Sequence, residues 1–144
     1  MSAEARRALT EARTIAVLGA SDKPGRAGFY VPEYLTLQGY RVLPINPRRV
    51  GETLWGQPVL GSLAAVEGPV DILNVFRAPE HLPGHVDEVL SMAPRPGVVW
   101  LQLGVLDETF QRAMAEAGVP VVADRCTMAD HRAFGLGSVP DGGW

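Results

Sequence analysis

A Gly-rich segment directly after the first apolar run is the part of this chain best suited to bind an anion. The run Thr14–Leu18 leads into Gly19–Gly28, which reads Gly-Ala-Ser-Asp-Lys-Pro-Gly-Arg-Ala-Gly and precedes a segment of helical spacing. A strand, a turn and a helix in this order leave backbone N–H groups free at the start of the helix, where phosphate groups bind. The residues predicted to contact the anion are Gly19, Ala20, Ser21 and Lys23.

This segment departs from two familiar phosphate-binding turns. The dinucleotide-binding turn reads Gly-x-Gly-x-x-Gly, and the second glycine is missing here. The P-loop requires Gly-Lys-Ser/Thr, which is also missing. The alternative to an anion site is an ordinary strand-to-helix turn in which the glycines only provide backbone freedom and Lys23 is a solvated loop residue.

Two arginines follow the second apolar run and bear on the kind of ligand. The run Val42–Ile45 continues as Asn46-Pro47-Arg48-Arg49. An NAD site places Asp or Glu at this point to bind the ribose hydroxyls, whereas guanidinium groups bind phosphate bidentately. The pair therefore favours a ribose that carries a phosphate, as in the 3′-phosphate of coenzyme A or the 2′-phosphate of NADP. A solvated surface pair is the alternative.

Three further apolar runs also end in residues that could contact a ligand. An arginine and a proline follow the third run, a glutamine and a glycine follow the fourth, and the only cysteine of the chain follows the fifth. In open parallel sheets, ligands bind beyond the carboxyl ends of the strands, so these loops should meet at one edge. The candidate residues are Phe76, Arg77, Pro79, Gln102, Gly104 and Cys126.

The elements that must position these loops are short apolar strands that alternate with amphipathic helices. The strands show no polar alternation, as expected when helices cover both faces of a parallel sheet. The alternation predicts an α/β fold, a Rossmann-like doubly wound three-layer sandwich with a five-stranded parallel sheet in the order 3-2-1-4-5. The predicted strands are Ile15–Leu18, Val42–Ile45, Ile72–Phe76, Val98–Leu101 and Val121–Ala123.

The intervening segments carry the helical signals. Residues up to Glu11 favour a leading helix. Pro32 is expected in the first turn of a helix that ends before Gly39, because a missing N–H does little harm there. A later helix is expected between a cap at Asp107 and a stop at Gly118. Two more helical segments are expected at residues 62–67 and 82–93.

Composition limits the class of protein. The chain has 144 residues, 47% of them hydrophobic, a net charge of −3 and one cysteine. The length predicts one domain over residues 1–144, and the single cysteine excludes an intrachain disulfide. We expect a core of about 14–133 and, because chain ends are often poorly ordered, a flexible tail at 138–144. With no strongly basic field, no apolar run of membrane length and no signal peptide, we expect a cytoplasmic protein that binds neither nucleic acid nor membranes. A protein partner remains open.

Taken together, the loops resemble the CoA-binding domain family, a Rossmann-like module also found in the α subunits of succinyl-CoA synthetase. The stand-alone bacterial members are the most similar. The resemblance covers about Thr14 to Ala133 and rests on the order and spacing of several short motifs. These motifs are Gly19-Ala-Ser-Asp-Lys-Pro24, Pro44-Ile-Asn-Pro47, Arg77-Ala-Pro-Glu80, Trp100-Leu-Gln-Leu-Gly104 and Asp124-Arg-Cys126.

The resemblance implies that coenzyme A lies across the strand ends. The Gly-rich turn would hold the pyrophosphate, and Arg48 or Arg49 would meet the 3′-phosphate. Phe76, Arg77 and Pro79 would flank the adenosine. Gln102 and Gly104 would face the pantetheine.

A complete catalytic apparatus is not expected. Cys126 is a candidate nucleophile, with His131 nearby, but a lone cysteine at a strand end is more often a small buried hydrophobe. A mixed disulfide with the thiol of coenzyme A is a further hypothesis. His81 and His85 have the spacing of metal ligands, yet Pro83 interrupts them and no third ligand is evident, so we expect no metal site.

Three functions follow from the sequence. The first is a module that binds coenzyme A or an acyl-CoA without a complete catalytic apparatus. The second is an oxidoreductase-like protein that binds NADP or NAD, which the turn length and the missing acid disfavour. The third is a protein–protein adaptor with an unused nucleotide cleft.

Overall fold

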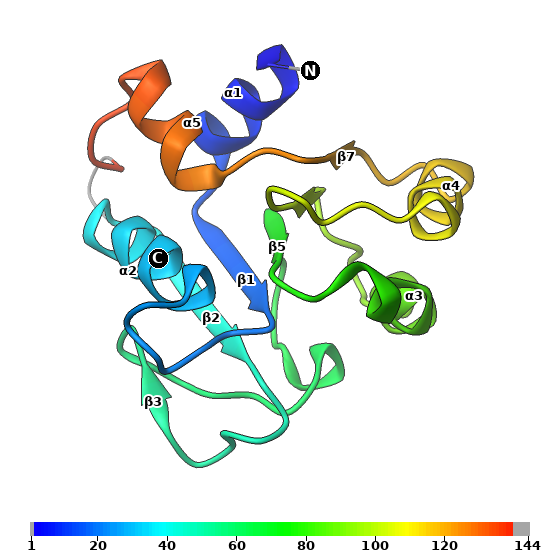
Figure 1. Ribbon diagram of the computed structural model, residues 1–144, viewed down its shortest axis with the longest axis horizontal. Coiled ribbons are helices and arrows are strands. Elements are labelled where there is room, and N and C mark those ends of the chain that lie inside the picture. The colour runs from blue at the N-terminus through cyan, green and yellow to red at the C-terminus, as the bar shows by residue number, and fades with distance from the viewer. Residues whose placement is uncertain (1, 140–144) are drawn as a thin grey trace.

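The computed structural model describes residues 2–139 and has helices on both sides of a central sheet (Figure 1). The tail predicted at 138–144 therefore falls mostly outside the described residues. The strands are β1 Thr14–Leu18, β2 Arg41–Ile45, β3 Thr53–Leu54, β4 Gln57–Pro58, β5 Ile72–Val75, β6 Val98–Leu101 and β7 Val121–Val122. The helices are α1 Ser2–Glu11, α2 Ala27–Leu37, α3 Val86–Leu90, α4 Glu108–Glu116 and α5 Thr127–Phe134, with short 3-10 helices η1 Leu63–Ala65 and η2 Pro79–His85.

The five-stranded parallel sheet is confirmed, but the predicted strand order is wrong. The observed order is β2-β1-β5-β6-β7. In terms of the predicted strands this is 2-1-3-4-5 rather than 3-2-1-4-5, because the third strand pairs with β1 instead of with β2. A two-stranded hairpin, β3–β4, which the sequence reading missed, lies on the connection that makes this crossing.

The position of β2 at the edge of the sheet has a physical reason. Pro44 lies in the middle of this strand and has no N–H to donate, so β2 is best tolerated at the edge of a sheet. That edge is partly covered by Leu60, whose amide donates to the Pro44 carbonyl at 2.9 Å and whose carbonyl accepts from Asn46 at 2.8 Å. The chain then passes over β1 to form β5 on its other side. The connection after β1 therefore runs toward β2, whereas the connection after β5 runs in the opposite direction, toward β6.

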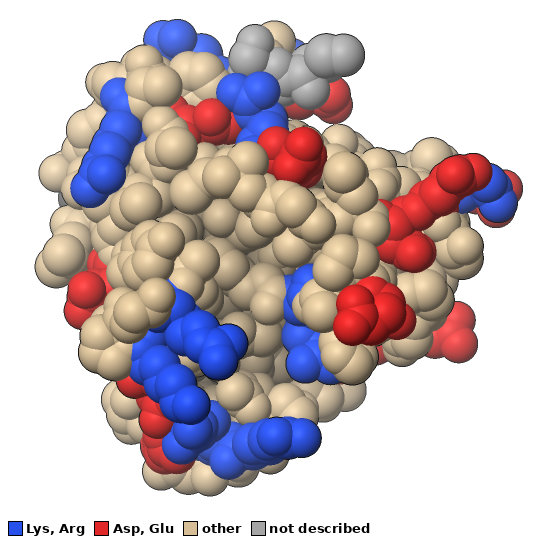
Figure 2. Space-filling view, in the orientation of Figure 1, with Lys and Arg blue, Asp and Glu red and all other residues tan. Residues whose placement is uncertain are grey.

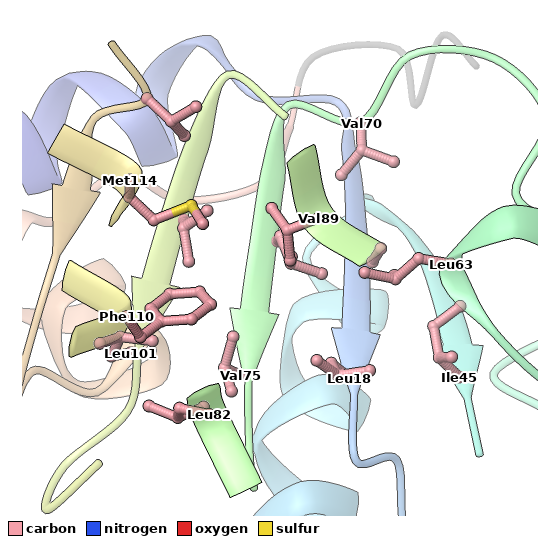
Figure 3. Close-up of a cluster of buried hydrophobic side chains, with 14 of the residues drawn as sticks. Leu18, Ile45, Leu63, Val70, Val75, Leu82, Val89, Leu101, Phe110 and Met114 are labelled. Carbon is pink, nitrogen blue, oxygen red and sulfur yellow. The ribbon is translucent and has the colours of Figure 1, made fainter. Parts of the chain in front are cut away.

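The core consists of two layers, one on each face of the sheet. Successive residues of β1 alternate between them: Ile15 and Val17 face one layer, and Ala16 and Leu18 face the other. The first layer is completed by α1, α2 and α5, and the second by η2, α3 and α4. Figure 3 shows the second layer, where side chains of the helices pack onto those of the strands. The three-layer sandwich is thereby confirmed.

Helix α2 begins earlier than the sequence suggested. Because it starts at Ala27, Pro32 lies in its interior rather than in its first turn, and that expectation was wrong. A proline at this position leaves the carbonyl of residue 28 without its usual donor. The Gly28 carbonyl instead accepts the Ser21 amide at 3.1 Å. Because Pro32 lies inside the helix, the Gly28 carbonyl is free to bond the Gly-rich loop to α2.

The other helix signals are closer to the observed structure. Asp107 caps α4 by accepting the Phe110 amide at 2.8 Å, and Gly118 follows with a positive φ of 77°. At the end of the described chain, the Val139 amide donates to the Gln38 carbonyl at 2.7 Å. Within residues 2–139, no helix combines the length and apolarity that a membrane crossing requires.

Candidate functional site

A cleft of about 730 Å³ opens at the carboxyl ends of β1, β2 and β5. Its position at the divergence between β1 and β5 is where doubly wound sheets bind ligands. We call it the basic cleft, because Lys and Arg side chains gather on two sides of a hollow in this face, over the loops after β1 and β2 and beside the loop after β5 (Figure 2). The predicted residues that line it are Gly19, Ala20, Ser21, Lys23, Asn46, Pro47, Arg48, Arg49, Phe76 and Arg77.

Two glycines let the walls of the basic cleft approach one another. Gly19 has a φ of 90°, and a Cβ there would lie 2.7 Å from the Phe76 carbonyl oxygen. A Cβ on Gly28 would lie 3.0 Å from the Gly19 carbonyl oxygen. Any side chain at these positions would push the Gly-rich loop away from the end of β5 or from α2. The predicted role of the loop glycines in geometry is therefore real, whether or not the loop binds an anion.

The hydrogen bonds of the loop determine which of its groups remain available. The Gly19 and Ala20 amides both donate to the Ile45 carbonyl at 3.2 Å, and the Ser21 amide is used by Gly28. In the described part of the chain, the Ala27 and Gly28 amides at the start of α2 donate to no protein acceptor. Free donors to an anion thus lie at the helix N-terminus rather than at the first three residues of the loop.

Asn46 fixes the second wall of the basic cleft to the first. Its Nδ2 donates to the Ala20 carbonyl at 2.8 Å, and its Oδ1 accepts the Arg48 amide at 2.9 Å. The second contact forms a tight turn through the exposed Pro47. The asparagine therefore holds the Gly-rich loop and aims the arginine pair, which a carboxylate at this position could not do through an N–H donor.

The two arginines after β2 are not equivalent. Arg49 lies 3.0 Å from the Asp22 carboxylate and 3.5 Å from Glu52, so its charge is largely compensated. Arg48 is exposed and, within residues 2–139, its side chain makes no ion pair or hydrogen bond. Arg48 is consequently the better placed of the two to bind an incoming phosphate.

The opposite wall contains the predicted residue Arg77 together with His85 and Glu88, which the sequence did not assign to the nucleotide site. Arg77 lies beside Gly19, with its Cδ 3.2 Å from the position of a Cβ on that glycine. His85 and Glu88, which also line the cleft, form a hydrogen bond of 2.8 Å between Nδ1 and Oε1. The spacing of three residues between this histidine and glutamate was a usable signal, since such residues share a helix face.

Four of the predicted ligand residues do not line the basic cleft: Pro79, Gln102, Gly104 and Cys126. Pro79 opens η2, as a proline at a first helical position should. The Gly104 amide donates to the Asp124 carboxylate at 2.8 Å, which joins the loops after β6 and β7. Cys126 is partly exposed at the start of α5.

Gln102 belongs to a buried cluster that we call the polar network, formed with Asn74 and Thr127. Its Oε1 accepts from Asn74 Nδ2 at 3.0 Å and from the Thr127 amide and hydroxyl at 3.1 Å. Thr127 Oγ1 also lies 3.0 Å from Asn74 Oδ1. The network joins β5, β6 and the first turn of α5, with Gln102 Oε1 as the acceptor that its members share.

The structure also bears on two earlier hypotheses, a Cys126 nucleophile with His131 nearby and a metal site at His81 and His85. His131 is buried, and its Nδ1 lies 2.7 Å from the Tyr34 hydroxyl. Burial lowers the pKa of His131, a shift that the Gly137 backbone partly opposes. Across residues 2–139, no group of three or more His, Cys, Asp or Glu side chains is arranged to hold a metal ion.

The sheet topology, the Gly-rich turn and the basic walls define a Rossmann-like α/β domain with a basic cleft, and comparison with known proteins gives its family. Residues 13–132 match the CoA binding domain, so the chain belongs to this family. It is 38% identical over 130 residues to uncharacterized protein YneT of Bacillus subtilis, which covers 90% of this chain and 93% of that one.

Solved structures support the same assignment. A Thermus thermophilus protein superposes with a TM-score of 0.87 at 53% identity, covering 92% of this chain and 98% of that one. A hypothetical protein from Pyrococcus horikoshii has a TM-score of 0.84 at 29% identity, with 92% and 91% covered. The predicted family membership and the Rossmann-like fold are thus confirmed.

Proposed function

We propose that this chain binds coenzyme A or an acyl-CoA in the basic cleft, as a binding module without a complete catalytic apparatus. The observation that carries the proposal is the pair of cationic groups on opposite sides of the Gly-rich loop, Arg48 after β2 and Arg77 after β5. Coenzyme A carries phosphate at two separate places, the ribose 3′-position and the pyrophosphate. Membership of the CoA binding domain family supports the same ligand.

The assignment of phosphates follows from the position of each group. Arg48 stands at the end of β2, where a ribose lies in doubly wound folds, and it would bind the 3′-phosphate. The pyrophosphate would be bound by groups of the Gly-rich segment, namely the Ala27 and Gly28 amides and the Ser21 hydroxyl, together with Arg77. Asn46 occupies the place of the acidic residue that NAD binding requires, which argues against the oxidoreductase alternative.

A thermal-shift titration with coenzyme A, dephospho-coenzyme A, NADP and NAD tests the proposal. A ligand that binds only the folded state raises the melting temperature by mass action. We expect a rise with coenzyme A, a smaller rise with the dephospho form and none with NAD. A response to NADP alone would move the chain to the oxidoreductase class, and no response to any of the four would favour the adaptor.

A further inference from the structure

Arg77 is held by a chain of hydrogen bonds that ends outside the basic cleft. Its Nε donates to His85 Nε2 at 3.3 Å, and His85 Nδ1 lies 2.8 Å from Glu88 Oε1. The other carboxylate oxygen of Glu88 accepts the Leu63 amide at 3.0 Å. Four segments, the end of β5, η2, α3 and η1, are linked in this way. The side chains of His85 and Glu88 are only 19% and 26% exposed.

The chemistry of the three side chains determines which atom donates and which accepts in each of these hydrogen bonds. A guanidinium group has only donors, so His85 Nε2 must accept from Arg77. Nδ1 then carries the proton and donates to Glu88, whose two oxygens are both occupied. The histidine is therefore neutral and fixed in one tautomer, and the backbone of η1 anchors the far end.

Only one of the three guanidinium nitrogens of Arg77 is used by this contact. Among the described residues, the two Nη nitrogens have no hydrogen-bond or ion-pair partner. The side chain passes within 3.2 Å of the Cβ position of Gly19, at the start of the Gly-rich loop. Two guanidinium nitrogens of a residue that lines the basic cleft are thus available near the place assigned to the pyrophosphate, and such a pair can bind a phosphate through two hydrogen bonds.

We propose that His85 and Glu88 are positioning residues that orient Arg77 toward the pyrophosphate of the ligand. This inference rests on the proposed function, because it names a device within the same cleft. An arginine side chain loses considerable rotamer freedom when it binds an anion, and a side chain that is already held loses less. The device therefore raises affinity without touching the ligand through either positioning residue.

The test is a calorimetric titration of coenzyme A and dephospho-coenzyme A into the wild type and four variants. His85→Leu removes the acceptor for Arg77, whereas His85→Gln keeps an oxygen near the position of Nε2. Arg77→Leu removes the guanidinium, and Arg77→Leu/His85→Leu closes a double-mutant cycle. Circular dichroism confirms that each variant is folded before the titration.

We expect His85→Leu to weaken coenzyme A binding by roughly fivefold to tenfold, about the effect of one lost hydrogen bond. His85→Gln should restore most of that loss. In the Arg77→Leu background, the histidine substitution should have no further effect, since it acts through the arginine. The loss should be equal for the dephospho ligand, because the pyrophosphate is present in both.

Contrary outcomes separate this inference from the proposed function. If the wild type binds coenzyme A but His85→Leu binds equally well, or weakens binding just as much without Arg77, the positioning role is overturned and the function stands. If the loss occurs with coenzyme A and vanishes with the dephospho ligand, Arg77 serves the 3′-phosphate and the assignment to the pyrophosphate is overturned. If the wild type binds neither ligand, the proposed function fails and the inference fails with it.

Discussion

The basic cleft and the polar network lie toward the same edge of one sheet, but they differ in whether their polar groups have protein partners. In the basic cleft, the Arg48 guanidinium, the Nη groups of Arg77 and the amides that open α2 are without protein partners among the described residues. In the polar network, Asn74, Gln102 and Thr127 bond to one another away from solvent. Under the proposed function, the donors of the basic cleft would bind the ligand, whereas the polar network holds strands and a helix of the fold together.

This contrast predicts that the two regions fail differently when they are altered. Variants of the polar network should lose stability and keep the intrinsic affinity for coenzyme A. Variants of the basic cleft should lose affinity and keep stability.

Gln102→Leu should destabilise the fold more than any other change considered. It removes the acceptor of the Thr127 amide, and a buried donor left unpaired costs about 1–3 kcal/mol. The Thr127 hydroxyl and Asn74 Nδ2 lose one acceptor each but keep Asn74 Oδ1 and the Trp100 carbonyl. We expect a loss of up to about 3 kcal/mol in the free energy of unfolding, measured by urea denaturation. Thr127→Val, which removes only the hydroxyl, is the milder control. A change in coenzyme A affinity of the folded variant larger than its change in stability would contradict the separation.

Arg48→Glu should weaken coenzyme A binding by roughly 100-fold, because it removes a charge-assisted hydrogen bond and places a like charge near the 3′-phosphate. The melting temperature without ligand should stay the same. Arg7→Glu, at an exposed position on α1, gives the same change in net charge and should leave the affinity unaltered. Equal losses in the two variants would mean that only the overall charge of the protein matters.

Arg49→Ala should weaken binding only a few-fold, since its charge is already compensated and exposed ion pairs are worth about 1 kcal/mol or less. Part of that loss comes from the Asp22 carboxylate, which would then repel the phosphates. The double variant Asp22→Asn/Arg49→Ala should therefore recover affinity in a calorimetric titration. If it binds no better than the single variant, the loss in Arg49→Ala comes from a direct contact of Arg49 with the ligand.

His131 should make stability depend on pH without affecting the basic cleft. Burial lowers its pKa, so the unfolded chain takes up a proton more readily than the folded one. The stabilising contribution is complete above the ordinary pKa of about 6.5 and is lost as the pH falls through and below it. His131→Asn, which can still bond Tyr34 but does not titrate, should flatten the dependence between about pH 7 and 5 in denaturation experiments. An unchanged slope would assign the effect to other groups.

Much of the fold could be read from the sequence because apolar strands and capped helices follow local rules. Asp107 and Gly118 bounded α4 correctly, since a cap and a stop are determined by neighbouring residues. The strand order depends on pairing between distant segments, which local patterns do not encode. One clue was nevertheless present: Pro44 favours an edge strand, and the predicted order would have placed that strand inside the sheet.

The candidate site was predictable by location and less so by atom. The loops after β1, β2 and β5 were correctly expected to meet, because parallel strands end at a common edge. Which groups are free could not be foreseen. The Ser21 amide donates to the Gly28 carbonyl, which Pro32 leaves without its usual donor inside α2. The charge of Arg49 is compensated by Asp22, which lies on another loop. The role of Gln102 depends on α5, a helix that the sequence reading did not predict.

The most direct test of the account is the perturbation of backbone amide NMR signals by coenzyme A. If the unused donors bind the phosphates, the largest shifts should occur at Ala27 and Gly28, whose amides donate to no protein acceptor in the described part of the chain. Smaller shifts are expected at Arg48 and Arg77, whose side chains would contact the phosphates, while the Thr127 amide, already bonded to Gln102, should change little. Shifts concentrated at Gly104, Cys126 and Thr127, with none in the basic cleft, would contradict the central claim that the partnerless donors are the binding site.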